Sequence, residues 1–473
     1  MSTPDFFRSR LETMLDPKHP LCVLAHKMPW KELTEALERE RAGQPKEQRT
    51  LLREDLFGVT EQVVVGNPNA GRPALSVRLL AGLLYLKHAY NESDESVCAR
   101  WAENPYWQYF CGEEYFQPRL PCDPTKLVQF RRWLKDGGVE ELLAQTINAA
   151  VSIKAVNPRE FKRVIVDTTV QEKAIAHPTD SRLLEVARHK LVKLAKAHGV
   201  ALKQTFQKEG KLLRLRAGRY AHARQFRRMR RAIRRQRTIV GRLLRTLWRY
   251  PEVVDRHRAL LERIERLCQQ RSKDKNKVYA LHAPEVECIS KGKARQRYEF
   301  GVKASIAVTE KSCLVVGARA FAGNPYDGHT LAEQIEQTTI LMQDIAGSPR
   351  PETVIVDLGY RGAQVDGVEL IHRGRIKSLS KQQRRWLKRR QAVEPVIGHL
   401  KDDCGMRRCW LKGELGDAMH TVLCAAGYNL RFLMRAIALF CALLWSKVVA
   451  MLQPYFAGKL ASSDDATLPL VAG

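Results

Sequence analysis

Hydrophobic positions in the first third of the chain recur every three and four residues, as they do on one face of a helix. Leucines follow this spacing from Leu75 to Leu86, after Pro73, which suits the first turn of a helix. A second helix is predicted over residues 95–103, behind a short polar turn, and a cluster of aromatic residues follows it. This helix pair fits either a helix-turn-helix or a packed helical subdomain, and we expect the aromatic residues to lie in a core.

From residue 161 onward the pattern changes to short runs rich in β-branched residues, which favour strands. These runs cover residues 162–167, 298–309, 313–321, 352–357 and 375–379. The second and third runs are close enough to form a hairpin, and a helical pattern over residues 329–347 joins the third run to the fourth. Strands and helices in this order predict an α/β core.

A long segment, residues 181–290, separates the first predicted strand from the hairpin and concentrates positive charge. Seventeen Lys or Arg residues stand against one acid over residues 201–250, and residues 214–249 hold fourteen arginines and no acid. Because compensating acids are lacking, this run is suited to nucleic-acid phosphates rather than to a simple solvated face. The arginines that we expect to contact DNA are Arg227, Arg228, Arg231, Arg234 and Arg235.

The same segment carries two apolar stripes. The first runs from Phe226 to Leu247 and the second from Val253 to Leu267, which together predict an antiparallel helical hairpin. The first stripe is also suited to pairing between subunits. We therefore expect a homodimer on DNA.

The composition of the whole chain agrees with a polyanionic partner. Its 473 residues carry 80 Lys and Arg against 51 Asp and Glu, a formal charge of +29. Eleven scattered cysteines without a Cys-x-x-Cys pair favour a reducing compartment, and we expect neither a signal peptide nor ATP binding. Ser446 and Lys447 interrupt the apolar stretch 436–452, so we expect a buried C-terminal helix, no membrane span and a cytoplasmic, nucleoid-associated protein.

The tetrapeptide Val-Ile-Val-Asp occurs twice and delivers Asp167 and Asp357 at the ends of two predicted strands. Ligands of α/β sheets gather at the carboxyl ends of strands. Carboxylate oxygens suit Mg²⁺, and phosphodiester chemistry uses two such ions held ~3.5–4 Å apart. Glu394 is the best candidate for a third carboxylate, because helical spacing puts Arg390 and Lys401 on its face, where they suit phosphate.

Two other residues have a less specific pattern. Lys303, on the predicted hairpin, is a candidate for contact with a DNA phosphate, and water is the alternative. Asp327, in the Asn-Pro-Tyr-Asp turn, is interpreted as a turn residue rather than as a metal ligand.

These residues make the chain similar to the DDE transposases of bacterial insertion sequences, which have an RNase H-like catalytic domain. The resemblance rests on Asp167, on Asp357 with the phrase Asp-Leu-Gly-Tyr-Arg-Gly that it opens, and on an Arg-(3)-Glu-(6)-Lys motif. Arg390, Glu394 and Lys401 form that motif. The resemblance covers about residues 50–125 and 160–435.

The resemblance implies a transposase that binds the terminal inverted repeats of its element, cleaves DNA and joins it elsewhere. It implies that Asp167, Asp357 and Glu394 bind two Mg²⁺ ions, with Mn²⁺ as a substitute. Water is then the first nucleophile, and a freed 3′-hydroxyl attacks the target DNA. Two alternatives stay open: a non-catalytic repressor derived from a transposase, and an RNase H-like nuclease without strand transfer.

The predicted organisation has three parts. Residues 1–155 form an N-terminal helical DNA-binding domain, and residues 156–435 form an RNase H-like mixed-sheet catalytic domain of the α/β class. The Arg-rich helical insertion, 181–290, interrupts the second part. Residues 436–473 form a C-terminal helix and tail.

Overall fold

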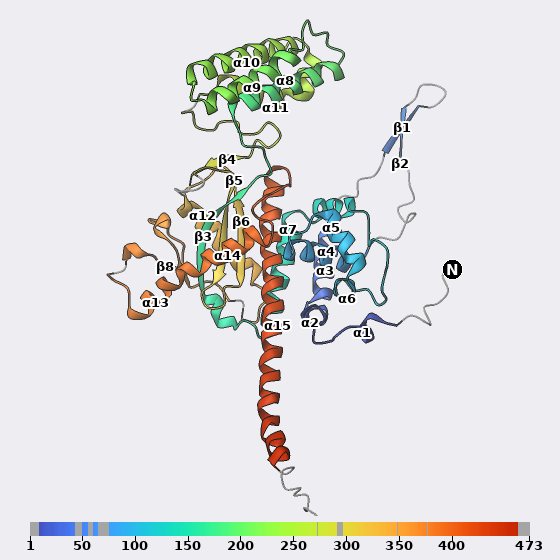
Figure 1. Cartoon of the computed structure of the whole chain (residues 1–473), viewed down its shortest axis with the longest axis vertical. Coiled ribbons are helices and arrows are strands. Elements are labelled where there is room, and N and C mark those ends of the chain that lie inside the picture. The colour runs from blue at the N-terminus through green and yellow to red at the C-terminus, as the bar shows by residue number, and fades with distance from the viewer. Residues whose placement is uncertain are drawn as a thin grey trace, which may run out of the picture.

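One long helix, α15 (Gly413–Ala461), runs through the molecule and organises the rest of the chain around it (Figure 1). A group of N-terminal helices lies on one side of α15 and a mixed β-sheet lies on the other, while a separate bundle of helices stands beyond one end of the sheet. The computed structural model describes residues 9–42, 50–54, 60–64, 75–271, 273–290, 297–347, 349–375 and 377–461.

The sheet combines antiparallel and parallel strands, in the order β4-β5-β3-β7-β8, with β6 also paired to β5. Its strands are β3 (Arg163–Glu172), β4 (Glu287–Ile289), β5 (Glu299–Thr309), β6 (Val315–Phe321), β7 (Thr353–Ile355) and β8 (Glu369–Ile371). The strands β4, β5, β6 and β3 pair antiparallel, whereas β3, β7 and β8 pair parallel. The α/β expectation is confirmed, and the four runs over 162–167, 298–309, 313–321 and 352–357 each contain a strand.

Two details of the strand prediction are wrong. The run 375–379 is no strand where the structure describes it, because β8 comes earlier, at Glu369–Ile371, and a turn of 3-10 helix follows at Arg373–Arg375. β3 does not end at Asp167 but continues to Glu172, since β5 is long enough to pair with it over that whole length. The length of a short β-branched run is therefore a poor guide to the length of the strand, because pairing with a long neighbouring strand can extend it.

Helices cover the sheet on both faces and supply its core. These are α12 (Asp327–Leu341), α13 (Lys381–Arg389), α14 (Val393–Asp402) and α15. The fully buried residues of β3 and β7 belong to one core cluster with Leu331 of α12 and Leu400 of α14. Ile340, which the predicted apolar face of α12 includes, is instead half exposed.

The N-terminal part is a packed helical unit. Its helices are α1 (Leu11–Met14), α2 (Pro20–Lys27), α3 (Trp30–Ala42), α4 (Val77–Ala89), α5 (Asp94–Glu103), α6 (Pro105–Phe110) and α7 (Thr125–Ser152). The predicted helix pair corresponds to α4 and α5, and a capping box at Ser93 starts α5. Trp101, Trp107 and Phe110 are buried, which confirms their core role.

The same part contains a feature that hydrophobic spacing does not predict. A hairpin of β1 (Thr50–Glu54) and β2 (Thr60–Val64) stands in a region expected to be helical. The exposed face of α5 carries Glu95 and Glu103 beside Arg100, so this helix lacks the concentrated positive charge of a groove-reading helix. The DNA-binding role of the N-terminal part and the three domain boundaries stay predictions.

Four helices lie between β3 and β4: α8 (Asp180–Ala197), α9 (Gln207–His222), α10 (Phe226–Leu247) and α11 (Pro251–Gln269). Val240 and Leu247 of α10 are buried against Leu261 and Ile264 of α11, in a core separate from that of the sheet. From Ile233 to Leu247 the apolar stripe of α10 therefore packs inside its own bundle, and only Phe226 at its start is half exposed, so most of the stripe is not open to the expected pairing of subunits. Gln236, the break in that stripe, is buried and hydrogen-bonded to Ser181.

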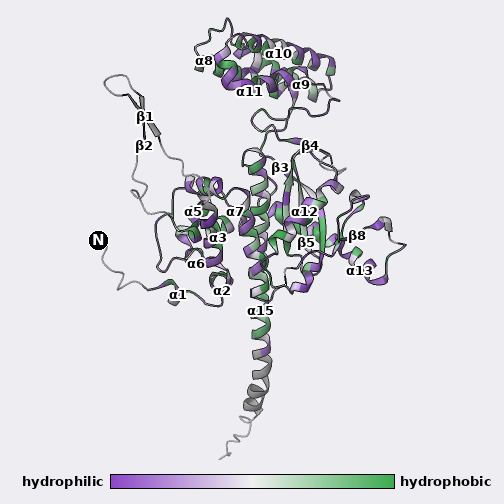
Figure 2. Cartoon of the chain, turned by 180° about the vertical axis from the view of Figure 1, so that it is seen from behind, coloured by the Kyte–Doolittle hydropathy of each residue, from purple (hydrophilic) through white to green (hydrophobic). Residues whose placement is uncertain are grey.

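The expectation of a buried C-terminal helix is correct for only part of α15. Its residues from Met419 to Ile437 include the side chains that pack between the N-terminal helices and the sheet. Figure 2 shows the hydrophobic character of α15 continuing past this core. There Leu439, Phe440 and Leu443 are more than 60% exposed, because no described element packs on them. By length and composition, Gly413–Lys447 is also apolar enough to span a membrane, although a third of its most apolar window is buried.

Candidate active site

Asp167 and Asp357 lie at the same level on neighbouring parallel strands. Ile165 of β3 pairs with Ile355 of β7 at the end of their ladder, and each acid comes two residues after its isoleucine, so continuing this register sets the two acids opposite each other. Adjacent strands are ~4.8 Å apart, and residues at equal positions in register project from the same face. Both acids are partly exposed, whereas the three residues before each of them are buried. The repeated tetrapeptide thus places two carboxylates side by side.

Each of the two acids is also fixed by backbone groups. The amide of Thr168 donates to Oδ1 of Asp167 over 2.8 Å. The amide of Gly359 donates to Oδ1 of Asp357 over 2.8 Å, so Asp357 caps the short 3-10 turn that follows β7. Each hydrogen bond uses one oxygen and leaves the second carboxylate oxygen for other partners.

Glu394 lies at the start of α14, opposite these strands. A capping box at Ser380 starts α13, and a 3-10 turn at Arg390–Ala392 separates α13 from α14. Pro395 is the third residue of α14, where the missing amide hydrogen costs no helical hydrogen bond. Glu394 therefore opens a new helix, and its side chain is 60% exposed.

Arg390 joins Glu394 to the sheet. Its guanidinium donates to Oε1 of Glu394 over 3.2 Å and to Oδ2 of Asp167 over 3.4 Å. The position of Arg390 on the face of Glu394 is as predicted from helical spacing, whereas its pairing with Glu394 and with Asp167 was not predicted. Its contact with DNA phosphate stays a prediction. All three predicted acids thus belong to one cluster, and a single arginine spans two of them.

A fourth carboxylate, Asp327, belongs to the same cluster. It opens α12, and Oδ1 accepts hydrogen bonds from the hydroxyl of Thr168 over 3.0 Å and from Lys303 over 2.8 Å. A Cβ at Gly359 would stand 2.9 Å from an oxygen of Asp327 and 2.9 Å from one of Asp357, so these two acids flank that glycine. The sequence pattern around Asp327 predicted only a turn residue, whereas the fold places its carboxylate in the acid cluster.

Tyr360 is a second residue that sequence reasoning missed. Its ring is buried beneath the acids, and burial raises the pKa of its phenol well above the ordinary value, with Asp167, Asp327 and Asp357 raising the pKa further. The phenol therefore stays protonated at neutral pH. The sequence feature that could have identified Tyr360 is its position within Asp-Leu-Gly-Tyr-Arg-Gly, three residues after Asp357.

The two lysines predicted to contact DNA are themselves buried and pair with carboxylates instead. The Lys303 ammonium pairs with Asp327 and donates to the carbonyl of Pro325 over 2.5 Å. The Lys401 ammonium lies 3.6 Å from Oε1 of Glu299, and both of these side chains are buried. The expectation that these two amines are exposed is therefore wrong. Lys401 neutralises the buried carboxylate of Glu299, and Lys303 neutralises the partly exposed carboxylate of Asp327.

The arginines of α10 divide into two groups. Arg227, Arg228, Arg231 and Arg234 are exposed. Arg235 instead pairs with Glu209 of α9 over 2.6 Å, so its charge is partly compensated within the bundle. Sequence reasoning missed this pairing because Glu209 lies just outside the acid-free stretch.

The chain matches two family models. One is described as "Transposase domain (DUF772)" and matches residues 9–133, and the other is "Transposase DDE domain" and matches residues 266–430. The second match includes Asp357 and Glu394, whereas Asp167 lies before it, on the far side of α8–α11. The chain is also 43% identical over 222 residues to "Uncharacterized protein ORF8 in nfe locus" of Rhizobium meliloti, which is 47% of this chain and 95% of that protein. No solved structure matches the chain.

The mixed sheet, the helices on its faces and the DDE match define a protein with an RNase H-like core. The chain belongs to the DDE transposases of bacterial insertion sequences. The two matched domains support a transposase function.

Proposed function

We propose that this transposase binds the terminal inverted repeats of its own element, cleaves the DNA at these ends and joins them to a target. The observation that carries the proposal is the in-register pair Asp167 and Asp357, joined to Glu394 through Arg390. Three carboxylates from two strands and a helix then converge on one partly open site. Such a convergence is suited to hard cations and to phosphodiester oxygens.

The donor set fits divalent metal ions. Asp167, Asp357 and Glu394 offer only oxygen ligands, and Glu394 is exposed enough to be reached by a substrate. Mg²⁺ prefers such ligands, and Mn²⁺ accepts them too. Two bound ions would activate the attacking oxygen and stabilise the leaving oxygen.

Charged and polar groups around the acids hold the carboxylates in position. Arg390 reduces the repulsion between Asp167 and Glu394, and it is permanently charged, so it positions groups and does not transfer protons. The Lys303–Asp327 pair ties β5 to the start of α12. The protonated phenol of Tyr360 adds no negative charge beneath the carboxylates.

The exposed arginines of α10 are the proposed DNA-binding surface. Arg227, Arg228, Arg231 and Arg234 lie on one helix without a nearby acid in sequence. Phosphate contacts supply affinity and orientation rather than base selection. This surface therefore accounts for binding to both element ends and target DNA, while the residues that read the inverted repeat lie elsewhere.

A strand-transfer assay with Glu394→Gln tests the proposal. Purified protein, Mg²⁺ and pre-cut element ends with 3′-hydroxyls should join those ends to a plasmid. The Glu394→Gln variant should bind the ends equally well and join them at least about 10²-fold more slowly, the loss typical of removing one charge-stabilising group. Cleavage without joining in the unmodified protein would favour a nuclease, and binding without either reaction would favour a repressor.

Transposition needs two ends held together, so we extend the proposal to a homodimer. Because most of the stripe of α10 is buried, the exposed apolar residues of α15 are the better contact between two copies. These residues are Leu439, Phe440, Leu443, Leu444 and Trp445. Phe440 and Leu444 continue the face that Leu433 and Ile437 bury, one and two helical turns further along, and Leu439, Leu443 and Trp445 widen the apolar surface around the helix.

A charge on this face should separate the copies. Phe440→Glu with Leu443→Glu should give a monomer by light scattering, keep single-end binding and lose paired-end complexes. Leu215→Glu is the matched control, because Leu215 is an equally exposed leucine on α9. A dimer that persists in the double variant would place the contact elsewhere.

A further inference from the structure

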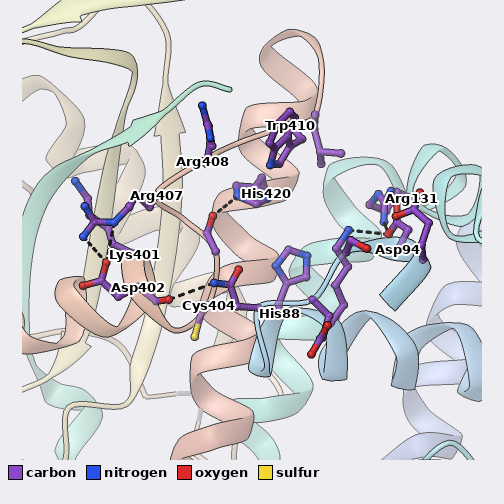
Figure 3. A pocket seen from close by; sticks show the side chains of 17 residues that line it. His88, Asp94, Arg131, Lys401, Asp402, Cys404, Arg407, Arg408, Trp410 and His420 are labelled. Carbon is purple, nitrogen blue, oxygen red and sulfur yellow. Dashed lines mark hydrogen bonds and ion pairs between the residues drawn. The ribbon is translucent and has the colours of Figure 1, made fainter. Parts of the chain in front are cut away.

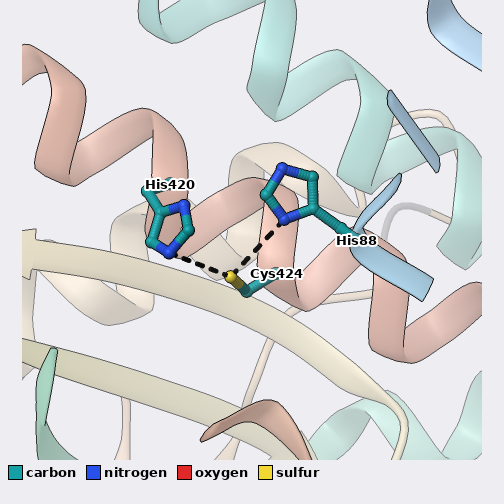
Figure 4. Close-up of side chains that lie close together, drawn as sticks. All are labelled: His88, His420 and Cys424. Atoms are coloured by element: carbon teal, nitrogen blue, oxygen red, sulfur yellow. Dashed lines mark hydrogen bonds between the residues drawn. The ribbon is translucent and has the colours of Figure 1, made fainter. Parts of the chain in front are cut away.

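A second cluster of chemically active side chains lies far from the four acids, where the N-terminal helices meet α15. His88 comes from α4, and His420 and Cys424 come from successive turns of α15 (Figure 4). All three side chains are buried. Neither DNA binding nor the carboxylate site uses them.

The three side chains point at one another. Sγ of Cys424 lies 3.7 Å from Nδ1 of His88 and 3.6 Å from Nε2 of His420, and the three atoms lie within 4.8 Å of one another. Zn–S bonds of ≈ 2.3 Å and Zn–N bonds of ≈ 2.0–2.1 Å at a tetrahedral angle give an N···S separation of about 3.5 Å. The two observed N···S separations are thus close to those of a thiolate and an imidazole bound to one ion.

The surroundings hold these ligands in place. The carbonyl of Cys404 is a hydrogen-bond acceptor for His88, and the carbonyl oxygen of Gly405 lies 3.1 Å from Nε2 of His420. The carbonyl contact of His88 orients that imidazole. At His420 the Gly405 carbonyl faces the same nitrogen that faces Cys424, so this carbonyl lies where a further oxygen ligand would be.

A cavity of about 660 Å³ reaches the cluster (Figure 3). His88 and His420 line it together with Gly405 and Trp410. It connects the cluster to the boundary between the N-terminal helices and the loop after α14, which gives an ion a way in. The fourth position of a tetrahedral ion is then left to the Gly405 carbonyl or to water.

We propose that His88, His420 and Cys424 bind one Zn²⁺ ion that fastens α4 to α15. The Cys424 thiol loses its proton to solvent as the Zn–S bond forms, and no oxidation occurs. Borderline-soft Zn²⁺ suits this mixed nitrogen and sulfur set, whereas the all-oxygen set of the acids suits Mg²⁺. The site is structural, because it joins the unit over residues 9–133 to the helix that crosses the sheet.

Metal content and cobalt spectroscopy of the untagged full-length protein test this site. We expect about one zinc per chain after purification without chelators. Replacement by Co²⁺ should produce the near-ultraviolet thiolate-to-cobalt charge-transfer band that reports a cysteine ligand. A protein that retains no zinc and gives no such band would overturn the proposal, whatever its transposition activity.

Variants assign the ligands. Cys424→Ser should abolish the band and lower zinc content to near zero, and His420→Asn should do the same for zinc. Cys441→Ser, a partly buried cysteine on the same helix, should leave both unchanged, and so should Asp167→Asn at the acid cluster. Zinc and the band persisting in Cys424→Ser would refute this ligand set.

A stability measurement separates metal loss from misfolding. Chelation should lower the thermal unfolding midpoint of the unmodified protein, because a ligand bound only to the folded state stabilises it. Cys424→Ser should already unfold at that lower temperature and should not respond further. An unmodified protein whose midpoint ignores chelation would count against a structural ion.

Discussion

Replacing Asp167 or Asp357 by asparagine is expected to lower end cleavage and strand transfer at least about 10³-fold, because metal ions at such sites contribute several kcal/mol of charge stabilisation. Asparagine keeps the size of each side chain and its contact with the Thr168 or Gly359 amide, but it removes the negative charge. Folding and DNA binding should therefore persist. Cleavage assays with Mg²⁺ and with Mn²⁺, run beside a binding assay, measure the difference.

The matched control is Asp344→Asn, since Asp344 is exposed and lies outside the cluster. It should cleave and join DNA like the unmodified protein. Asp327→Asn should lose less activity than Asp167→Asn, because Asp327 already pairs with Lys303 and Thr168. Full activity in Asp167→Asn would mean that the in-register pair is not the catalytic centre.

Replacing Arg227, Arg228, Arg231 and Arg234 together by glutamine is expected to weaken DNA binding about 10²–10³-fold at physiological salt. Each lost phosphate contact lowers the slope of log affinity against log salt by about 0.9, so the slope should fall by about 3 to 4. The loss should be equal for element ends and for unrelated DNA, because phosphate contacts carry no sequence information. Titrations at several salt concentrations measure this slope.

The control carries the same change in charge on other parts of the chain. It replaces four exposed cationic residues by glutamine: Lys126, Arg132, Arg159 and Lys311. This variant should keep most of the salt slope, since net charge alone acts weakly across a screened distance. An equal loss in both variants would mean that α10 is not a specific DNA-binding surface. Loss confined to the element ends would show that α10 reads bases.

Local sequence was sufficient for features that depend on neighbouring residues. Three β-branched residues before Asp167 and Asp357 predicted buried strands, and the spacing from Arg390 to Glu394 predicted that these two side chains share one face. The α10–α11 hairpin followed from its apolar stripes in the same way. Each of these features depends only on residues within one strand or a few helical turns. Over that distance the periodicity of the backbone fixes the direction of each side chain.

Other features depend on which segments meet, and no local pattern contains that information. The sequence predicted Asp327 as a turn residue, but the fold places it beside Thr168 and Gly359. It predicted Lys401 as a phosphate ligand, but the fold places Lys401 beside Glu299. Burial of the α10 stripe and exposure of Leu443 on α15 likewise depend on the presence or absence of a packing partner.

The sequence by itself thus determined the α/β class, the three acids and the basic segment, because each follows from residue type and short-range periodicity. Only the tertiary structure decided how Asp167 and Asp357 align, which cations are paired internally and that His88 meets Cys424, 336 residues further along the chain. The physical reason is that charge pairing, desolvation and metal geometry are properties of atoms in contact, and contacts between distant segments form only when the chain folds.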